Sequence, residues 1–341
     1  MESSKSQWTE DLISRNCPCC DSNDTKVISK KMKDGINLPT VICKKCALVY
    51  SNPIPKVETI NRFYTEAYND YYIHIPKLEI PNRIPSYMEK IIEVIVRHLP
   101  DKNSSILEIG SGNGLLLYYL QKKYKNALGI EPGPNIKDAI SRFGLNAIHG
   151  FFETYDFGDK KFDALMMLHV FEHFYDINET LEKCNSLLKK DGLLFFELPN
   201  IHKPYHSLDN YFLRYVHLIN YSESSVENML RKHGFEVVYR KTSRHSYLSP
   251  YNLFVVAQKK EKAANNNYSG DYKKTVRILN EYRLKWYLFE KYFVFVYAVA
   301  ANNYRHFVSS LLKTRFGDQL RKRKKSISKQ LYQVIKKAGI Y

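Results

Sequence analysis

A leader and a long apolar run are both missing from this chain of 341 residues. Residues 1–16 are polar and lack the apolar core of a signal peptide. The most apolar stretch, residues 286–301, contains Glu290 and Lys291 and is shorter than the roughly 20 apolar residues that cross a bilayer. We therefore expect a cytoplasmic protein, in which the six cysteines are free to bind metal and need not form disulfides.

Acidic residues are scarce and an internal repeat is missing. The chain has 52 Lys and Arg against 35 Asp and Glu, a formal net charge of +17. Part of the excess lies in residues 313–341, where Asp318 is the single acidic residue. A hydrophobic content of 44% is ordinary for a globular protein, and the length allows one large domain with appendages.

A glycine-rich turn at residues 106–114, with the sequence Ile-Leu-Glu-Ile-Gly-Ser-Gly-Asn-Gly, is the strongest single motif. It reads as an apolar strand, a tight turn and the start of a helix over residues 115–124. Glycine lets a backbone approach a ligand closely, and the N-terminus of the helix offers free N–H groups. Residues 128–131 form a second apolar run that ends in Glu131, where a carboxylate can accept hydrogen bonds from ribose hydroxyls.

The ligand of this turn is indicated by two departures from the dinucleotide fingerprint. Leu115 stands where that fingerprint has Gly or Ala, and Glu108 would repel a pyrophosphate but attract an ammonium group. The residues resemble motifs I and II of the class I S-adenosylmethionine-dependent methyltransferases, whereas the glycines alone also fit an ordinary strand–helix turn. The resemblance implies cofactor contacts from Glu108, Gly110, Ser111, Gly112, Gly114, Glu131, Pro132, Phe151, Phe152, Leu168 and His169.

Further segments match this family in the same order along residues 85–260. The first are a short strand at 145–148, followed by residues 149–153, and an apolar run from Phe162 that ends in His-Val-Phe-Glu-His. The others are a helix end, turn and fifth strand at 187–200, a helix at 222–234, and two β-rich runs at 235–240 and 253–258. The resemblance implies an α/β fold with a doubly wound, mostly parallel seven-stranded Rossmann-like sheet.

The segment His169–His173 also spells the His-x-x-Glu-His pattern of inverted zinc proteases. That signature needs a helix, whereas this segment directly follows an apolar strand. Some quinone-biosynthesis and RNA-end methyltransferases carry Glu-x-x-Glu-His here, which resembles a divalent metal site; in this chain His169 replaces the first Glu. Glu172 and His173 could also simply cap and pack the loop.

Two Cys-x-x-Cys pairs near the N-terminus predict a structural zinc. Cys17, Cys20, Cys43 and Cys46 have the spacing of two zinc knuckles, with β-rich residues 26–33 and 40–42 between them as a hairpin. Cys19 could in principle replace Cys20 as a ligand. A disulfide is the weaker alternative, and unliganded surface thiols are the remaining one.

The cysteine pairs are followed by an aromatic segment, and together they resemble the zinc-binding front end of bacterial sugar and polysaccharide-pathway methyltransferases. In such relatives the front end covers the acceptor side of the cofactor pocket. The Tyr-His-Glu-His segment of the related sugar C-methyltransferases is absent, so C-methylation is not supported. We expect a zinc ribbon at 1–55, an aromatic lid at 56–84, the methyltransferase domain at 85–260 and a basic helical extension at 261–341.

The extension joins a long helix, 272–310, to a basic helix at 313–337. An apolar face flanked by Lys and Arg suits peripheral contact with anionic lipid at the inner face of the membrane. The alternative is packing against this domain or another subunit. Nucleic acid would use the same charge, but no recognised RNA-binding module accompanies it.

Methyl transfer to a hydroxyl requires removal of a proton, usually by histidine. The candidates are His169, His173, His202, His206 and His217, with His173 and His217 ranked first. The predicted activity is S-adenosylmethionine-dependent transfer to a small molecule or saccharide, in a cell-surface polysaccharide or related pathway. The alternatives are an RNA-directed methyltransferase and a non-enzymatic interaction protein with a degenerate cofactor site. The acceptor, the methylated atom and the oligomeric state are not indicated by the sequence.

Overall fold

The computed structural model describes residues 7–30, 36, 38–67, 76–205, 207–243, 251–262, 268 and 270–288. By compactness the chain divides into two units, Met1–Asn280 and Glu281–Tyr341. The sites discussed below all lie in the first unit. The predictions for residues 68–75, for His206 and for the chain beyond residue 288 fall outside the described residues.

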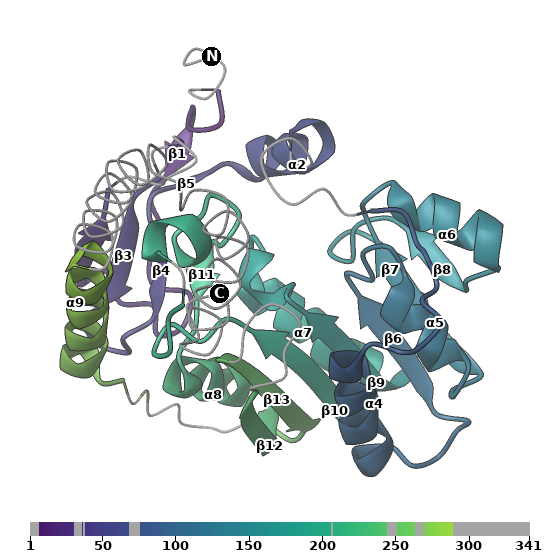
Figure 1. Cartoon of the computed structure of the whole chain (residues 1–341). Helices are drawn as coiled ribbons and strands as arrows, with labels where there is room; N and C mark the ends of the chain where they lie inside the picture. Colours follow the sequence, from purple (N-terminus) through teal and green to yellow (C-terminus); the bar gives the residue numbers. More distant parts are fainter. Residues whose placement is uncertain are drawn as a thin grey trace, which may run out of the picture. The chain divides into compact units, whose positions relative to one another are not determined.

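A seven-stranded sheet forms the centre of the first unit, with the strand order β12-β13-β10-β9-β6-β7-β8 (Figure 1). Strand β13 is antiparallel to both of its neighbours, β10 and β12. All other neighbouring pairs in the sheet are parallel. This confirms the predicted doubly wound fold. The strands are β6 (Ser105–Ile109), β7 (Asn126–Glu131), β8 (Ala147–His149), β9 (Phe162–Leu168), β10 (Leu188–Leu198), β12 (Phe235–Ser243) and β13 (Asn252–Lys259).

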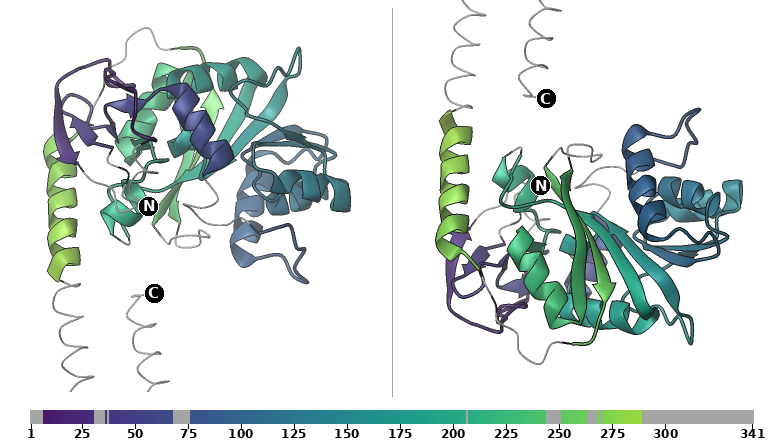
Figure 2. Two further views of the ribbon diagram at one scale, coloured as in Figure 1. Left: turned by 90° about the horizontal axis from the view of Figure 1, so that it is seen from above. Right: turned by 90° about the horizontal axis from the view of Figure 1, so that it is seen from below.

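The two faces of this sheet are buried by different helices because successive side chains of a strand point to opposite faces. Ile106 and Met166 pack with residues of α4 (Ser86–His98), α5 (Leu115–Gln121) and α6 (Asn135–Phe143). Leu107 and Met167 pack with α7 (Ile177–Leu187), α8 (Glu223–Lys232) and the N-terminal segment. Figures 1 and 2 show α5 and α6 beside the β6–β8 part of the sheet, whereas α4 lies nearer β10, where its His98 ring contacts Phe195.

A second sheet has the order β11-β4-β3-β2. Its strands β2 (Thr25–Ser29) and β3 (Thr40–Cys43) form the predicted antiparallel hairpin, and β4 (Val49–Ser51) follows. The fourth strand, β11 (Ile219–Asn220), comes from the far end of the methyltransferase region and pairs antiparallel with β4. The sequence analysis did not predict this pairing, because a two-residue strand has no readable periodicity.

The remaining front-end elements are a two-stranded pair, β1 (Leu12–Ile13) with β5 (Ile54–Pro55), and helix α2 (Val57–Glu66). Ile60 and Phe63 are the buried residues of α2. Helix α2 therefore packs on the domain through one face and leaves the rest of its surface for other contacts.

The segment at residues 187–200 differs locally from the prediction. No separate turn lies between helix and strand: α7 ends at Leu187 and β10 begins at Leu188, with a register shift against β9 between Leu188 and Leu193. Asp191, at φ +57°, lies in this irregular part. In place of the turn predicted within residues 187–200, the strand contains an irregularity between Leu188 and Leu193.

The chain after residue 270 continues as α9 (Tyr272–Leu288), so the described part of the predicted long helix is helical. Thr275 and Leu279 of this helix are buried, and Thr275 hydrogen-bonds His202 at 2.8 Å. None of the helices in the described ranges has the length and apolar character needed to cross a membrane.

Candidate active site

The glycine turn connects β6 to α5 and needs glycine for two distinct reasons. Gly110, Gly112 and Gly114 all have positive φ angles, of +73°, +57° and +85°, which side chains disfavour. A Cβ on Gly110 would collide with Val170, and one on Gly114 would lie 2.5 Å from Leu145. A Cβ on Gly112 would instead meet open space, with no described atom within 4 Å.

Glu131 is fixed at the end of β7 by the turn itself. Its carboxylate accepts hydrogen bonds from the backbone N–H of Gly112 at 2.9 Å and of Gly133 at 2.7 Å. Burial raises the pKa of Glu131, and these two hydrogen bonds oppose that rise. The predicted ribose-binding acid therefore stands directly beside the turn.

Glu108 is the buried acid behind the turn, with only 4% of its surface exposed. Its Oε2 atom has no hydrogen-bond partner among the residues that the structure describes. Burial, with the nearby charge of Glu131, raises the pKa of Glu108 to about 8. A buried carboxylate without a partner is costly, so a cationic ligand would be favoured at this position.

A cavity of about 530 Å³ opens at the carboxyl ends of β6, β7 and β9. In a doubly wound sheet this is where the strand order reverses and ligands bind. Of the predicted cofactor residues, the cavity is lined by Gly110, Gly112, Glu131, Pro132, Phe151, Phe152, Leu168 and His169. Glu108, Ser111 and Gly114 are not part of the lining; the Ser111 hydroxyl donates to the carbonyl of Glu108 at 3.1 Å.

The cavity fits S-adenosylmethionine in chemistry as well as in position. The ribose hydroxyls of the cofactor would reach Glu131 in the cavity wall, and the buried carboxylate of Glu108 behind the turn would attract its amino group without itself lining the cavity. The aromatic rings of Phe151 and Phe152 offer an apolar wall for adenine.

His169 follows β9 in the left-handed region, at φ +56°. Its Nε2 lies 3.2 Å from Glu197 Oε1 and 3.0 Å from Asn252 Nδ2, and its Nδ1 lies 3.7 Å from Glu172 Oε1. Burial lowers the pKa of His169, but the two carboxylates outweigh burial and raise it to about 9. The two acids thus favour the protonated form of His169, and a protonated imidazole is neither a base nor a metal ligand.

The helix that the inverted zinc-protease pattern requires is not formed. His169 lies before the short 3-10 helix η1 (Phe171–His173) and is not part of it. The geometry therefore supports the methyltransferase interpretation of this segment over the protease one.

The two histidines ranked first by sequence lie next to each other. The ring centroids of His173 and His217 are 5.0 Å apart, and His173 also lines the cavity. Burial lowers the pKa of both, to about 3 for His217. Tyr64 Oη lies 3.0 Å from His173 Nδ1, and Glu172 Oε1 lies 3.9 Å from His173 Nε2.

Glu172 completes a cluster with these two histidines. Each of the three offers a ligand atom, and these atoms lie within 4.8 Å of one another. Glu172 Oε2 and His217 Nδ1 are buried without a hydrogen-bond partner in the described ranges. Burial raises the pKa of Glu172, but the hydrogen bond from His169 and the neighbouring charges lower it to about 2.

Several site residues were missed by the sequence analysis. Helix α2 contributes Ile60, Asn61, Tyr64 and Thr65 to the cavity wall, and Glu197 and Asn252 hold His169. The first group lies within the segment 56–84 that was predicted as a lid, but none of its side chains had been assigned to the cavity. The other two lie within apolar strands, where a lone polar residue is the available signal.

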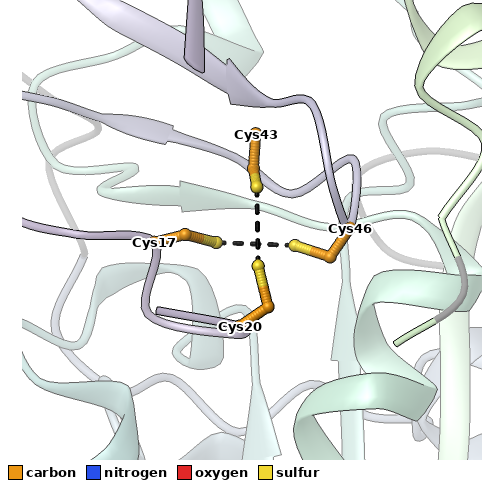
Figure 3. Close-up of side chains that lie close together, drawn as sticks. All are labelled: Cys17, Cys20, Cys43 and Cys46. Carbon is orange, nitrogen blue, oxygen red and sulfur yellow. Dashed lines mark hydrogen bonds between the residues drawn. The ribbon is translucent and has the colours of Figure 1, made fainter. Parts of the chain in front are cut away.

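The four cysteines predicted as ligands converge on one point (Figure 3). All are buried, and their Sγ atoms lie within 4.8 Å of one another, at 3.4 Å for Cys17–Cys46 and 3.5 Å for Cys20–Cys43. Four bonds of about 2.3 Å to a tetrahedral zinc place sulfurs about 3.8 Å apart. The cluster therefore has the donors and the size for zinc, and Cys19 is not a member of it.

Known proteins that resemble this chain are methyltransferases. Over 208 residues it is 22% identical to the C-methyltransferase NovU of Streptomyces niveus. The matched region covers 59% of this chain and 47% of the relative. Over 131 residues it is 28% identical to the mitochondrial ubiquinone biosynthesis O-methyltransferase of Bos taurus. This match covers 35% of this chain and 35% of the relative. The chain thus spans about half and about a third of the lengths of these relatives.

A solved structure of 1,6-didemethyltoxoflavin-N1-methyltransferase from Burkholderia thailandensis is 16% identical, with a TM-score of 0.48 over 64% of this chain and 98% of the other. The family model described as methyltransferase domain matches residues 83–240. Residues 83–240 are therefore similar to a methyltransferase domain, and they contain the glycine turn and most strands of the seven-stranded sheet.

Proposed function

We propose that the protein transfers a methyl group from S-adenosylmethionine to a small-molecule acceptor. The observation that carries this proposal is the unpartnered, buried carboxylate of Glu108 behind a glycine turn that borders a cavity. The cofactor supplies a methyl group on a sulfonium, so that the protein needs mainly to bind and orient the reactants. Glu131 and the aromatic wall hold the adenosine end, and Glu108 neutralises the amino end.

On the acceptor side we propose roles for His173 and His217. Burial keeps both imidazoles neutral, and His173 can then accept the proton of an acceptor hydroxyl, whereas a pKa of about 3 makes His217 a much weaker base. His173 lines the cavity and is the group in direct reach of an acceptor, while His217 lies behind it. A bound S-adenosylmethionine would supply the methyl group to the acceptor oxygen, and its sulfur would keep the electron pair of the carbon–sulfur bond.

A second candidate role for the same histidines is to bind a divalent cation together with Glu172. It is favoured by the buried, unpartnered Glu172 Oε2 and His217 Nδ1. The carboxylate oxygen suits Mn²⁺, whereas soft thiolates select zinc and Cu(I), so Mn²⁺ probes this cluster apart from the four cysteines. Titration with Mn²⁺ separates the two roles: stoichiometric binding that Glu172→Gln removes supports the cation, whereas no binding leaves the histidines as proton acceptors.

We also propose that Cys17, Cys20, Cys43 and Cys46 bind a structural zinc. Four thiolates leave no open coordination position, so this metal would stabilise the front end and take no part in chemistry.

The acceptor class and the location are proposed on resemblance and charge. The front end suggests a saccharide of a cell-surface pathway, and the basic residues 313–337 suggest peripheral contact with anionic lipid. One relative is named a C-methyltransferase and another an O-methyltransferase, so the methylated atom is left open. An RNA acceptor, the alternative, would show salt-sensitive binding.

Calorimetry with S-adenosylhomocysteine tests the cofactor assignment. We expect one binding site per chain, and a loss of affinity of about tenfold or more in Glu131→Gln, because a neutral amide is a weaker acceptor for two ribose hydroxyls. The matched control is Glu236→Gln on strand β12, which should bind like the parent. Equal affinity in all three proteins would contradict the proposed function. Incubation of metabolite mixtures with a methyl-labelled cofactor then identifies the acceptor.

A further inference from the structure

The acceptor-side histidines are each held by a different part of the front end, here defined as the described residues up to Ala67. We propose that Tyr64 and strand β4 position His173 and His217, so that the acceptor half of the active site depends on the front end. This inference rests on the proposed function only for the roles of the two histidines.

Tyr64 fixes the orientation of His173. Its hydroxyl lies 3.0 Å from His173 Nδ1, and both side chains line the cavity. With Nδ1 engaged, the ring presents Nε2 on its other side, where Glu172 Oε1 lies 3.9 Å away. A partner on one imidazole nitrogen sets the tautomer and so decides which nitrogen is available for chemistry.

Helix α2 can hold Tyr64 in place because its neighbouring residue is locked in the core. Phe63 is fully buried, and its ring packs 5.1 Å from Trp8 and 4.7 Å from Tyr215, measured between centroids. The Tyr215 hydroxyl donates to the backbone carbonyl of Trp8 at 2.8 Å. These contacts join α2, the N-terminal segment and the loop before His217 into one packed group.

Strand β4 fixes the segment that carries His217. Tyr50 pairs with Ile219 and Val49 with Asn220, and the Ser51 N–H donates to the carbonyl of Leu218 at 2.9 Å. These bonds begin at the residue immediately after His217. In Figure 1, β11 lies beside β4 accordingly.

The other end of this segment is tied to the main sheet. Tyr221 forms a parallel bridge with Asn200, just beyond β10, and the Ile201 N–H donates to the carbonyl of Tyr221 at 2.8 Å. Residues 217–221 therefore connect the ribbon sheet to the methyltransferase sheet, and His217 lies at the ribbon end of this connection.

The cysteine cluster controls the geometry of β4. Cys43 is the last residue of β3, Cys46 lies three residues before β4, and the Cys43 N–H donates to the carbonyl of Leu48 at 2.9 Å. Closing the four thiolates on one ion would thus hold the β3–β4 turn, and through β4 the segment after His217. The glycine turn belongs to β6 and β7 in the other sheet, so opening the cluster should not disturb it.

Such positioning matters because a reactant displaced by about 1 Å can lower the rate about a hundredfold. Emptying the cysteine cluster, by chelation or thiol oxidation, should therefore impair transfer to the acceptor while S-adenosylhomocysteine still binds. The front end would then be part of the active site and not only a cover over it.

The Tyr64 part of the proposal is tested by NMR of the full chain labelled with ¹⁵N-histidine. In Tyr64→Phe we expect the Nδ1 resonance of His173 to shift, because the hydroxyl 3.0 Å from this nitrogen is removed. The matched control is Tyr118→Phe on α5, which should leave the His173 signal unchanged. An unchanged Nδ1 resonance in Tyr64→Phe would overturn the positioning role of Tyr64.

Hydrogen exchange tests the β4 part. In Cys43→Ser we expect the amides of Ser51 and of residues 218–221 to lose protection by about tenfold or more, with residues 105–109 of β6 unchanged. Unchanged protection at Ser51, or an equal loss in β6, would overturn the proposal.

Should Cys43→Ser unfold the chain, Cys20→Ser is used in its place, because Cys20 lies outside the β3–β4 hairpin. Unfolding of both variants also overturns the proposal. A parent protein that binds no S-adenosylhomocysteine would refute the proposed function but leave these two measurements valid.

Discussion

The pKa of Glu108 makes cofactor affinity depend on pH in a way that one substitution should abolish. Burial raises this pKa from 4.5 to about 8 in the free protein, so Glu108 is protonated at pH 6 to 7. Binding the ammonium group of the ligand requires the carboxylate. Ionising Glu108 at pH 6 therefore costs two pKa units, about 2.7 kcal/mol at 1.36 kcal/mol per unit.

We expect the affinity for S-adenosylhomocysteine to rise about tenfold for each pH unit between pH 6 and about 7.5, with one proton released per ligand bound. The α-amino group of the ligand has an ordinary pKa near 8, so it stays protonated over this range. Calorimetry in two buffers of different ionisation enthalpy measures both the affinity and the released proton. In Glu108→Gln the affinity should be weaker and independent of pH.

Glu131→Gln is the control, because the pKa of Glu131 is also raised by burial. This variant should bind more weakly and still show a slope, displaced to lower pH, because the charge of Glu131 contributes to the raised pKa of Glu108. A flat profile in the parent, or the same slope in Glu108→Gln, would refute the assignment of Glu108 to the amino group.

The stability of the ligand-free protein provides an independent check that the pKa of Glu108 is raised and not lowered. An acid whose folded pKa lies above its unfolded value binds more protons in the folded state, so its contribution to stability falls as pH rises from 4.5 to about 8. The difference in unfolding free energy between Glu108→Gln and the parent should therefore grow in favour of the variant over that window. A constant difference would show that Glu108 ionises normally.

Three further predictions concern the glycine turn, the cysteines and the C-terminal part. Gly112→Val should abolish S-adenosylhomocysteine binding in a folded protein, because its Cβ points into open space at the cavity and its φ is +57°; unchanged affinity by calorimetry would contradict this. Elemental analysis should find one zinc per chain, reduced by Cys43→Ser but not by Cys19→Ser, whereas a metal-free folded parent would exclude the site. Truncation after residue 280, at the boundary between the two compact units, should keep the buried Thr275 and the cofactor affinity but end sedimentation with anionic vesicles at low salt; a full-length protein that ignores such vesicles would refute the membrane proposal.

The cofactor half of the site was predictable from sequence because its residues are close together along the chain. The turn and Glu131 lie within one strand–helix–strand unit, where spacing fixes geometry. The cysteine cluster was predictable for the same reason, since two Cys-x-x-Cys pairs joined by a hairpin leave few arrangements. The sequence also identified His173 and His217 as candidates, but gave no sign that their rings would be 5.0 Å apart.

The sequence by itself determined the strand–helix alternation, the glycine turn and the ligand types, because periodicity and local conformational demand act over a few residues. Only the tertiary structure decided the rest. It brought Tyr64 of α2 to His173, paired β4 with β11 across about 170 residues of chain, and placed His169 between Glu172 and Glu197. Contacts between distant segments depend on how whole layers pack, and neither a two-residue strand nor a single polar residue in an apolar run specifies its partner in advance.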